Sequence, residues 1–435
     1  MELVSLPESM AMLEESAAKE GQRVARKLIC DAITGWICSI LWPREVPDAE
    51  GGAPFRLHRW PTLQLNTACG VVEIRVPSYE KVGRPSLRPV EAALGLRASV
   101  TPGLERASAI LGSELSFKKA SEHLEELLHV EVSKDTVRNL CYELGAAAKE
   151  VEDSPEIPEG FGEIETAEVQ ADGGRVNTLD GWREPRIARI KLTSKTGMKL
   201  TFLITGIITC DELWDRIENT LKALGADTCK KLAFVSDGAD WILFEAARRF
   251  PHALLILDFY HVVKKLNEVA GIIFGTGTDA ARAWVRRYKK YLRRSQVEKA
   301  IHSLKCCRGH AKLSGSEAVD ALNRLIKYLE KRKDQLRYLK FKRRGFPIGS
   351  GMIEGTIKQV INLRLKRNAT PWAVENAERL LALRAAKLYG HLDRVCSRKL
   401  AMREAKIPAQ FQPLLASAPR LHLAVEAAES ASNAA

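Results

Sequence analysis

The chain has 435 residues, of which 46% are hydrophobic and 28% charged, and Lys plus Arg outnumber Asp plus Glu by 67 to 54. This composition is typical of a globular protein and excludes disordered and collagen-like classes, while the length predicts about two to four units, each with a hydrophobic core. The net charge of +13 favours a polyanion as partner, because neutralised phosphates release their bound counterions.

The amino-terminal region has no feature of a membrane or secreted protein. Its longest apolar stretch, residues 33–42, is about half as long as a bilayer crossing requires. The first residues lack the basic start and apolar run of a signal peptide, and the nine cysteines are scattered without a CxxC pair. We therefore expect a cytoplasmic protein with reduced thiols and no membrane partner.

Residues 1–100 are expected to form an accessory region. Apolar residues recur there at helical spacing until prolines and a glycine pair interrupt the pattern, which predicts a helix followed by a linker. Residues 62–76 then alternate between apolar and polar types on both sides of a turn. This alternation predicts a small β-hairpin.

Residues 101–152 are expected to form a helical DNA-binding region. Residues 115–144 predict two short helices separated by a turn, with Ser133 as the N-cap of the second. The predicted inward face consists of Ala120, Leu124, Leu127, Val137 and Leu140. In a helix-turn-helix, the residues presented to a major groove would be Lys134, Asp135, Arg138 and Asn139. An ordinary helical hairpin is the alternative interpretation.

The pattern of residues 163–265 changes to strands and helices in alternation. Strands are predicted at 166–172, 185–194, 198–207, 231–236 and 253–257, and helices at 211–224, at 239–250 and from residue 260. Three antiparallel strands followed by alternating helices and strands is the order of the ribonuclease H-like fold. The predicted fold class is therefore α/β, with a mixed five-stranded sheet and flanking helices.

An all-helical insertion is expected at residues 266–342, where no strand pattern occurs and a dense basic block, RRYKKYLRR, spans 286–294. Residues 343–392 are expected to complete the ribonuclease H-like core with two further helices, the first from about residue 352 to 366. The remaining residues, 393–435, are expected to form a carboxy-terminal tail.

Three acidic residues stand out in this strand order. Asp172 ends the first predicted strand, Asp237 ends the fourth, and Glu354 lies in the first turn of a late helix. The apolar residues spaced to pack that helix on the sheet are Ile353, Ile357, Val360 and Ile361. The first and fourth strands of a ribonuclease H-like sheet are neighbours, so we expect the three carboxylates to converge.

Clustered carboxylates repel one another unless cations hold them together. Hard oxygen ligands with room for water favour Mg²⁺ or Mn²⁺, and two such ions about 4 Å apart can catalyse phosphoryl transfer. Taken singly, each acid has a simpler explanation, as a turn residue beside glycine or as a partner of the helix dipole. The combination of all three favours a two-metal site with Asp172, Asp237 and Glu354 as ligands.

Three further residues compete for or support these roles. Asp240 could replace Asp237, but Asp237 directly follows the apolar strand and precedes a glycine. Asp258 and His261 are three residues apart at the start of a helix, where their side chains share a face. Asp258 could orient His261 near the active centre, or the pair could take a direct part in catalysis.

Five segments carry a resemblance to a known family. These are VQADGGRV, GWREPRIARI, FVSDGADWI, LDFYHVVKKL and PIGSGMIEGTIKQVINLRLKRNATPW. They resemble bacterial insertion-sequence transposases of the ISKra-like group, allied to the Mutator superfamily, over roughly residues 100–390. By this resemblance Asp172, Asp237 and Glu354 match the catalytic Asp-Asp-Glu triad, and Asp258 with His261 matches the superfamily's Asp-x-x-His signature.

The resemblance implies a transposase that cuts at terminal inverted repeats and joins the freed 3′ ends to a target, with two Mg²⁺ or Mn²⁺ ions per site. Its partners would be double-stranded DNA, as element ends and target, and a second copy of the chain, within the bacterial nucleoid. The expected DNA contacts are Lys134, Arg138, Asn139, Arg286, Arg287, Lys289, Lys290, Arg293, Arg294, Lys358, Arg364, Lys366 and Arg367. Tyr288 and Tyr291 could stack on bases or pack within the insertion. A nuclease without strand transfer and a non-catalytic or domesticated DNA-binding protein are the alternatives.

Overall fold

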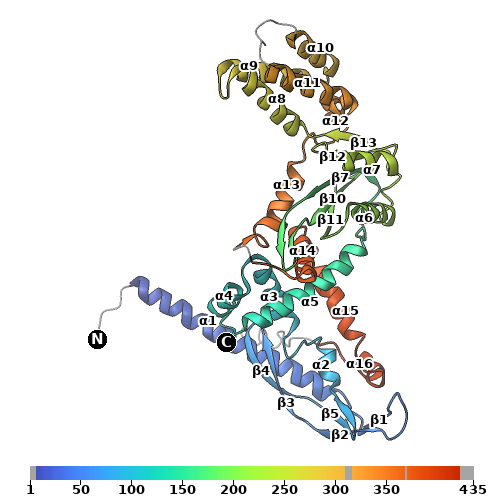
Figure 1. Cartoon of the computed structure of the whole chain (residues 1–435). Helices are drawn as coiled ribbons and strands as arrows, with labels where there is room; N and C mark the ends of the chain where they lie inside the picture. The colour runs from blue at the N-terminus through green and yellow to red at the C-terminus, as the bar shows by residue number, and fades with distance from the viewer. Residues whose placement is uncertain (1–5, 309–315, 368–369, 422–435) are drawn as a thin grey trace. The chain divides into compact units, whose positions relative to one another are not determined.

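The computed structural model describes residues 6–308, 316–367 and 370–421 (Figure 1). The chain is a mixed α/β protein that divides into two compact units. One unit combines residues 1–147 with 391–435, and the other consists of residues 148–390. Within the described ranges, no helix is both long enough and apolar enough to cross a membrane.

The first unit begins with one long helix, α1 (Leu6–Ser39), which packs on the predicted β-hairpin. The hairpin is confirmed and consists of β3 (Thr62–Thr67) and β4 (Gly70–Arg75), paired antiparallel. Its alternate residues are buried against α1, as the period-two pattern requires; they are Leu63, Leu65, Val72 and Ile74.

A second small sheet in this unit was not predicted. Its antiparallel strands follow the order β1-β2-β5-β6 and comprise β1 (Glu45–Val46), β2 (Phe55–Arg59), β5 (Ser78–Lys81) and β6 (Arg84–Leu87). The strands are short and rich in charged residues, so they lack the run of alternating apolar residues that identifies a strand in sequence.

The helical region of the first unit consists of α2 (Pro89–Ala93), α3 (Pro102–Glu114), α4 (Phe117–Leu128) and most of α5 (Lys134–Asp153), whose residues from 148 on belong to the second unit. The predicted cap of the last helix is confirmed, because the Ser133 hydroxyl accepts a hydrogen bond from the Thr136 amide at 3.1 Å. Leu127 is 67% exposed, contrary to its predicted place on the inward face. The helix ends one residue later, and the chain turns away through His129 in a left-handed conformation.

Residues after 391 belong to the first unit and do not behave as a tail up to residue 421. They form α15 (Leu392–Glu404) and α16 (Gln412–Ala416). Arg403 of α15 is buried and pairs with both oxygens of Glu105, at 2.6 and 2.7 Å. The sequence pattern missed this docking because the residue that anchors the helix is charged.

The second unit is built on a five-stranded mixed sheet, as predicted. The strands are β7 (Ile164–Gly173), β10 (Arg186–Ser194), β11 (Lys199–Gly206), β12 (Leu232–Ser236) and β13 (Leu254–Leu257). Their order is β11-β10-β7-β12-β13; the first three are antiparallel, whereas β12 runs parallel to both β7 and β13. A short hairpin, β8 (Val176–Thr178) with β9 (Gly181–Arg183), extends the ribbon of β7 and β10.

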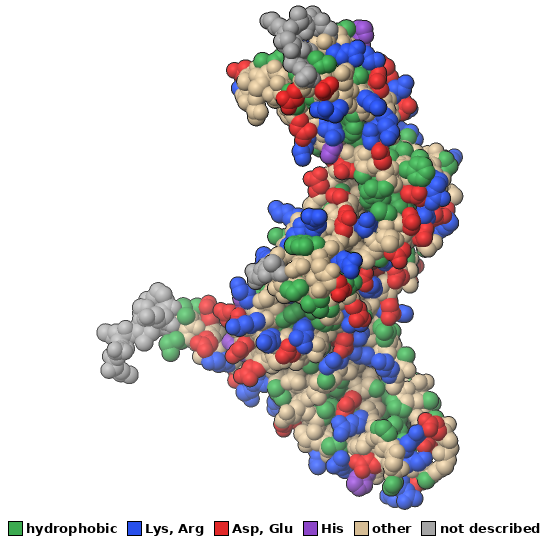
Figure 2. Space-filling view, in the orientation of Figure 1, with side chains coloured by type: hydrophobic (Ala, Val, Ile, Leu, Met, Phe, Trp, Pro, Cys, Tyr) green, Lys and Arg blue, Asp and Glu red, His purple; other side chains and the backbone are tan. Residues whose placement is uncertain are grey.

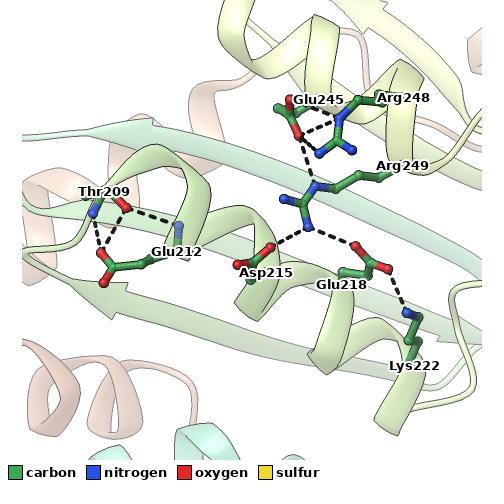
Figure 3. Close-up of polar contacts among 8 residues, drawn as sticks. All are labelled: Thr209, Glu212, Asp215, Glu218, Lys222, Glu245, Arg248 and Arg249. Carbon is green, nitrogen blue, oxygen red and sulfur yellow. Dashed lines mark hydrogen bonds and ion pairs between the residues drawn. The ribbon is translucent and has the colours of Figure 1, made fainter.

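One face of this sheet is covered by α6 (Cys210–Ala223) and α7 (Asp240–Arg249). Apolar residues of both helices pack on alternate strand residues, including Val169 and Phe234. Arg249 ties the two helices together, because its guanidinium bonds to Asp215, Glu218 and Glu245 at 2.7 to 3.0 Å (Figure 3).

The helix α13 (Gly351–Ile357) packs on β7 and β10, and α14 (Val374–Leu388) packs on β11. A π-helical turn, η2 (Lys358–Asn362), continues α13, so the predicted helix of residues 352–366 is interrupted in its middle. The apolar residues predicted to face the sheet are buried as expected: Ile353, Ile357, Val360 and Ile361.

The described residues between β13 and α13 form helices and no strand, as the sequence pattern predicts for residues 266–342 (Figure 1). The elements are α8 (Phe259–Phe274), α9 (Asp279–Arg293), α10 (Val297–Arg308), α11 (Ser316–Lys331), η1 (Lys333–Leu336) and α12 (Tyr338–Arg343). They share one hydrophobic core with inward residues of β12 and β13, such as Val235 and Leu257. We call these six elements the helical segment.

Candidate active site

The register of the sheet places Asp172 and Asp237 beside each other. The strands β7 and β12 pair in parallel up to Gln170 opposite Val235, and each acid lies two positions further along its own strand direction. Neighbouring strands are about 4.8 Å apart, and residues two positions apart share a face. Both carboxylates therefore belong to the face of Gln170 and Val235, opposite the face that α6 and α7 cover.

Two buried side chains bring the start of α13 to this same face. The amide oxygen of Gln170 accepts a hydrogen bond from the Ile353 backbone at 3.1 Å. One carboxylate oxygen of Asp258 accepts from the Ser350 amide at 2.8 Å and also from the Ser350 hydroxyl. Because α13 is held at its first turn, Glu354 lies near enough to the end of β7 for its charge to act on Asp172.

The electrostatic environment of Asp172 reflects this convergence. Burial raises the pKa of Asp172, and the negative charges of Asp237, Glu354 and Glu184 raise it further, whereas a 2.7 Å hydrogen bond from the Gly173 amide opposes the shift. Asp172 is half-buried, while Asp237 and Glu354 are exposed. Asp172 is therefore close enough to Asp237 and Glu354 for both of their charges to act on it.

Glu184 is a fourth acid that sequence reasoning missed. It precedes β10, and a Cβ atom placed on Gly173 would lie 2.5 Å from its Oε1 atom, which shows how close the Glu184 carboxylate comes to the end of β7. Because Arg186 pairs with Gly173, Glu184, two positions before Arg186, lies near the end of β7. The hairpin-like glycines of residues 173–181 could have indicated this neighbourhood, since a ribbon turning there returns beside Asp172.

The donor set suits a hard divalent cation, since it consists of carboxylate oxygens on a partly solvated surface. Among the described residues, however, no group of three or more His, Cys, Asp or Glu side chains already surrounds one point as a metal site would. Asp237 and Glu354 are exposed and can change rotamer, whereas the backbone positions of the acids are fixed by the sheet and by α13.

Asp240, the competitor of Asp237, is engaged elsewhere. Its Oδ1 atom lies 2.7 Å from Arg332 and 3.3 Å from Lys331, both at the end of α11. The charges that raise the pKa of Asp172 include that of Asp237. The choice of Asp237 over Asp240 remains a prediction.

Asp258 has a positioning role that the sequence did not specify. Its second oxygen caps α8 by accepting from the backbone amides of Tyr260 and His261, while the first binds Ser350. With both oxygens used and the side chain buried, Asp258 holds the helix that carries Glu354. His261 is half-buried and is bound to Asp258 through its backbone.

The predicted DNA contacts fall into three groups. On α5, Lys134 is exposed, and Arg138 and Asn139 are half-buried, with Arg138 paired to Asp135 at 2.8 Å. On α9 and just after it, the exposed basic residues are Arg286, Arg287, Lys290, Arg293 and Arg294, and Lys289 is half-buried. Basic side chains are interspersed with acidic ones on the visible face of the helical segment (Figure 2).

The third group follows Glu354 and needs one correction. Lys358, Lys366 and Arg367 are exposed, but Arg364 is only 6% exposed, and its guanidinium lies 5.1 Å from the ring centroid of Trp372. Stacking on this buried indole keeps Arg364 inside the protein, away from the surface on which a phosphate contact was predicted.

Tyr288 and Tyr291 lie on the same side of α9, with their ring centroids 6.1 Å apart in an edge-to-face contact, but they differ in burial. Tyr288 is buried and hydrogen-bonded to Ser303, so it packs within the helical segment. Tyr291 is half-buried, and its ring is flanked by Arg287 and Lys299.

A family model covers most of the chain, including every element that carries these acids. It matches residues 89–402 and is described as "Uncharacterised protein family (UPF0236)". The chain belongs to the UPF0236 family. A UPF0236 relative from Streptococcus gallolyticus, described as "UPF0236 protein in vanSb 3'region", is 23% identical over 404 residues, which are 88% of this chain and 82% of the relative.

The UPF0236 match begins at α2 and ends within α15. It thus leaves out the long helix α1 and both small sheets of the first unit, but includes the mixed sheet, the helical segment and α13. The candidate active site lies wholly inside the part of the chain that defines the family.

Proposed function

We propose that this UPF0236 chain is a DNA transposase of the Asp-Asp-Glu type, which binds the terminal inverted repeats of an insertion sequence and catalyses metal-dependent hydrolysis and strand transfer. The observation that carries the proposal is the meeting of Asp172, Asp237 and Glu354 on one face of the mixed sheet, although 182 positions separate the first from the last. Carboxylates that repel one another are typical of a site that binds cations.

The order of the strands supports a ribonuclease H-like core for this enzyme. The third, second, first, fourth and fifth strands of the sheet lie side by side in that order, and only the first three are antiparallel. This arrangement is the one expected for such a core, and the helical segment occupies the interval between the fifth strand and the helix of Glu354.

The chain's own residues would divide the work. Asp172, Asp237 and Glu354 would hold two Mg²⁺ or Mn²⁺ ions, which when bound activate a water or 3′-hydroxyl and stabilise the leaving oxygen. Gln170 and Asp258 keep the first turn of α13 on the sheet, so that Glu354 stays over the other two acids. The Gly173 amide fixes one oxygen of Asp172.

Basic side chains would bind and orient the DNA. The chain has a net charge of +13, and exposed Lys and Arg residues lie on α5, on α9 and after α13. Such contacts give sequence-independent affinity, while α5 is the candidate for reading bases in the major groove. Two element ends must be handled together, which favours a dimer in the DNA complex.

The test is a strand-transfer assay with a linear DNA that carries the native sequences flanking the gene, with Mg²⁺ or with a chelator, in the presence of a target plasmid. The proposal expects Mg²⁺-dependent cleavage at the ends and covalent joining to the target, both lost in Asp237→Asn. Cleavage without joining would indicate a nuclease, and binding without cleavage a DNA-binding protein. Unchanged cleavage in Asp237→Asn would remove the acid cluster from the reaction.

A further inference from the structure

We propose that Arg332, at the end of α11, is a positioning residue that holds the loop carrying Asp237, so that the helical segment sets the geometry of the acid cluster. The inference rests on the proposed function, because it concerns how the carboxylates are placed for cation binding. It gives the helical segment a task inside the active site in addition to any contact with DNA.

The loop after β12 is bound by Arg332 on the carboxyl side of Asp237. Nη2 of Arg332 donates to the Gly238 carbonyl at 3.0 Å and to Oδ1 of Asp240 at 2.7 Å. The loop residue between these two partners, Ala239, donates its amide to Asp237 at 3.0 Å. A single guanidinium thus fixes the backbone to which the Asp237 carboxylate is itself hydrogen-bonded.

The Arg332 side chain is buried, unlike the side chains of most surface ion pairs. Its residue is only 8% exposed, and its guanidinium carbon lies 4.5 Å from the ring centroid of Tyr328, one turn earlier on α11. A charge in such a place is costly unless its partners are well defined. The stacking and the two hydrogen bonds together determine where the guanidinium lies.

Gly238 allows this close approach. Its φ of +98° is rare for other residues, and an added Cβ atom would lie 2.7 Å from Leu257 and 3.0 Å from the Tyr328 hydroxyl. That hydroxyl is buried and has no hydrogen-bond partner among the described residues. Burial, together with the charges of Asp237, Asp258 and Asp240, raises the pKa of Tyr328 to about 12, which agrees with its place beside the acid cluster.

Lys331 provides a matched control because it pairs with the same carboxylate, that of Asp240, while its side chain stays exposed. Its Nζ atom lies 3.3 Å from Oδ1 of Asp240, and its side chain is 66% exposed. An exposed ion pair of this kind contributes little to stability. Lys331 and Arg332 are thus both positively charged and both pair with Asp240, but only Arg332 also binds the Gly238 backbone.

The experiment measures Mn²⁺ binding to the full chain by isothermal titration calorimetry, without DNA. Variants are Arg332→Met, Arg332→Lys, Lys331→Met and Asp237→Asn, each checked for folding by circular dichroism and thermal melting. Loss of a residue that orients metal ligands typically lowers metal affinity about 10- to 100-fold, which is the effect expected for Arg332→Met. Lys331→Met should stay within about twofold of the wild type, since it breaks only an exposed pair.

The outcomes separate the two proposals. If the wild type does not bind Mn²⁺, or if Asp237→Asn binds it equally well, the proposed metal site fails, and the inference fails with it. If binding depends on Asp237 but Arg332→Met keeps wild-type affinity, the proposed function stands and the positioning role of Arg332 is overturned.

Arg332→Lys keeps the test valid if the methionine variant does not fold. It retains the charge, but its shorter and non-planar head group cannot stack on Tyr328 and also reach both loop partners, so a several-fold weaker affinity is expected. Wild-type affinity in the lysine variant overturns the proposal whether or not the methionine variant folds.

Discussion

The second unit has two clusters of acidic side chains, one between α6 and α7 and one at the ends of β7 and β12. The two clusters differ in the charged groups that surround them. Between α6 and α7, Arg249 binds three carboxylates, and Arg248 pairs with one of them (Figure 3). The pKa values of Glu218 and Glu245 are lowered there, chiefly by hydrogen bonds from basic side chains.

At the strand ends, the charges acting on Asp172 are those of other acids, and its pKa is raised. No Lys or Arg within the described ranges pairs with Asp172, Asp237 or Glu354. The two clusters therefore differ in their partners: basic side chains neutralise the acids between α6 and α7, whereas the charge of Asp172 is compensated by no Lys or Arg side chain of the described ranges. A bound cation would supply that compensation under the proposed function.

Substitutions of the acids at the strand ends should have the greatest effect on activity. Asp172→Asn, Asp237→Asn and Glu354→Gln should each lower cleavage and strand transfer by at least about 1,000-fold, because each removes a cation ligand. Gel-shift binding to the element ends should remain nearly intact. The matched control is Glu245→Gln, from the paired cluster, which should keep its activity per folded molecule; equal losses in both clusters would contradict the distinction.

The basic block of α9 contains cationic side chains without acidic partners among the described residues. No acidic side chain of the described ranges pairs with Lys289 or Arg293, and the Arg293 guanidinium lies 5.2 Å from the ring centroid of Phe259. Lys289→Glu with Arg293→Glu should weaken binding to all DNA sequences and lower the slope of log affinity against log salt by about two. Fluorescence anisotropy at several salt concentrations measures this slope, and an unchanged slope would exclude the block from the DNA interface.

A smaller effect is expected when the paired cluster loses its central cation. Arg249→Met should lower the free energy of unfolding by about 1–3 kcal/mol, because Asp215, Glu218 and Glu245 would then repel one another beside a half-buried surface. Chemical denaturation measures the change. Lys222→Met, which removes an exposed partner of Glu218, should have little effect; similar losses in both variants would show that Arg249 has no special part in joining α6 to α7.

The smallest effect is a pH dependence at an acid that has a partner but is deeply buried. Glu152 bonds to Arg216 and to Thr205, yet burial raises its pKa to about 7. Because the folded state favours the protonated form, the free energy of unfolding should fall as pH rises from about 4.5 to about 7, by on the order of 1–3 kcal/mol. Glu152→Gln should remove this dependence in denaturation curves; a variant whose stability still falls over that range would contradict the assignment.

The sequence predicted the sheet because apolar residues alternate with polar ones in β7 and β10 and form short continuous runs in β12 and β13. Hydrophobic periodicity gave the strands, the helical segment and the buried face of α13, and strand order placed Asp172 beside Asp237. The second small sheet and the docking of α15 escaped prediction, since contacts such as Tyr79 with the Pro43 carbonyl and Arg403 with Glu105 join residues far apart in the sequence. Such contacts depend on distant partners that no local pattern records.

At the site, sequence reasoning found the acids but not what positions them. Gln170, Arg332 and Ser350 act through backbone hydrogen bonds to residues 92 to 183 positions away. Glu184 is near Asp172 only because of the register of β10 on β7. These relations are properties of the folded chain and could not be inferred from residue type or spacing.

The bond between Asp258 and Ser350 joins the two ends of the helical segment, and the Phe259 amide reinforces the junction by donating to the Ile348 carbonyl at 2.8 Å. The chain therefore leaves the sheet before the helical segment and returns to it, roughly ninety residues later, at the same place. The length of the helical segment can change without altering the distance between its two ends. Homologues should accordingly tolerate insertions and deletions in the turn between α8 and α9 far better than at the Asp258–Ser350 junction.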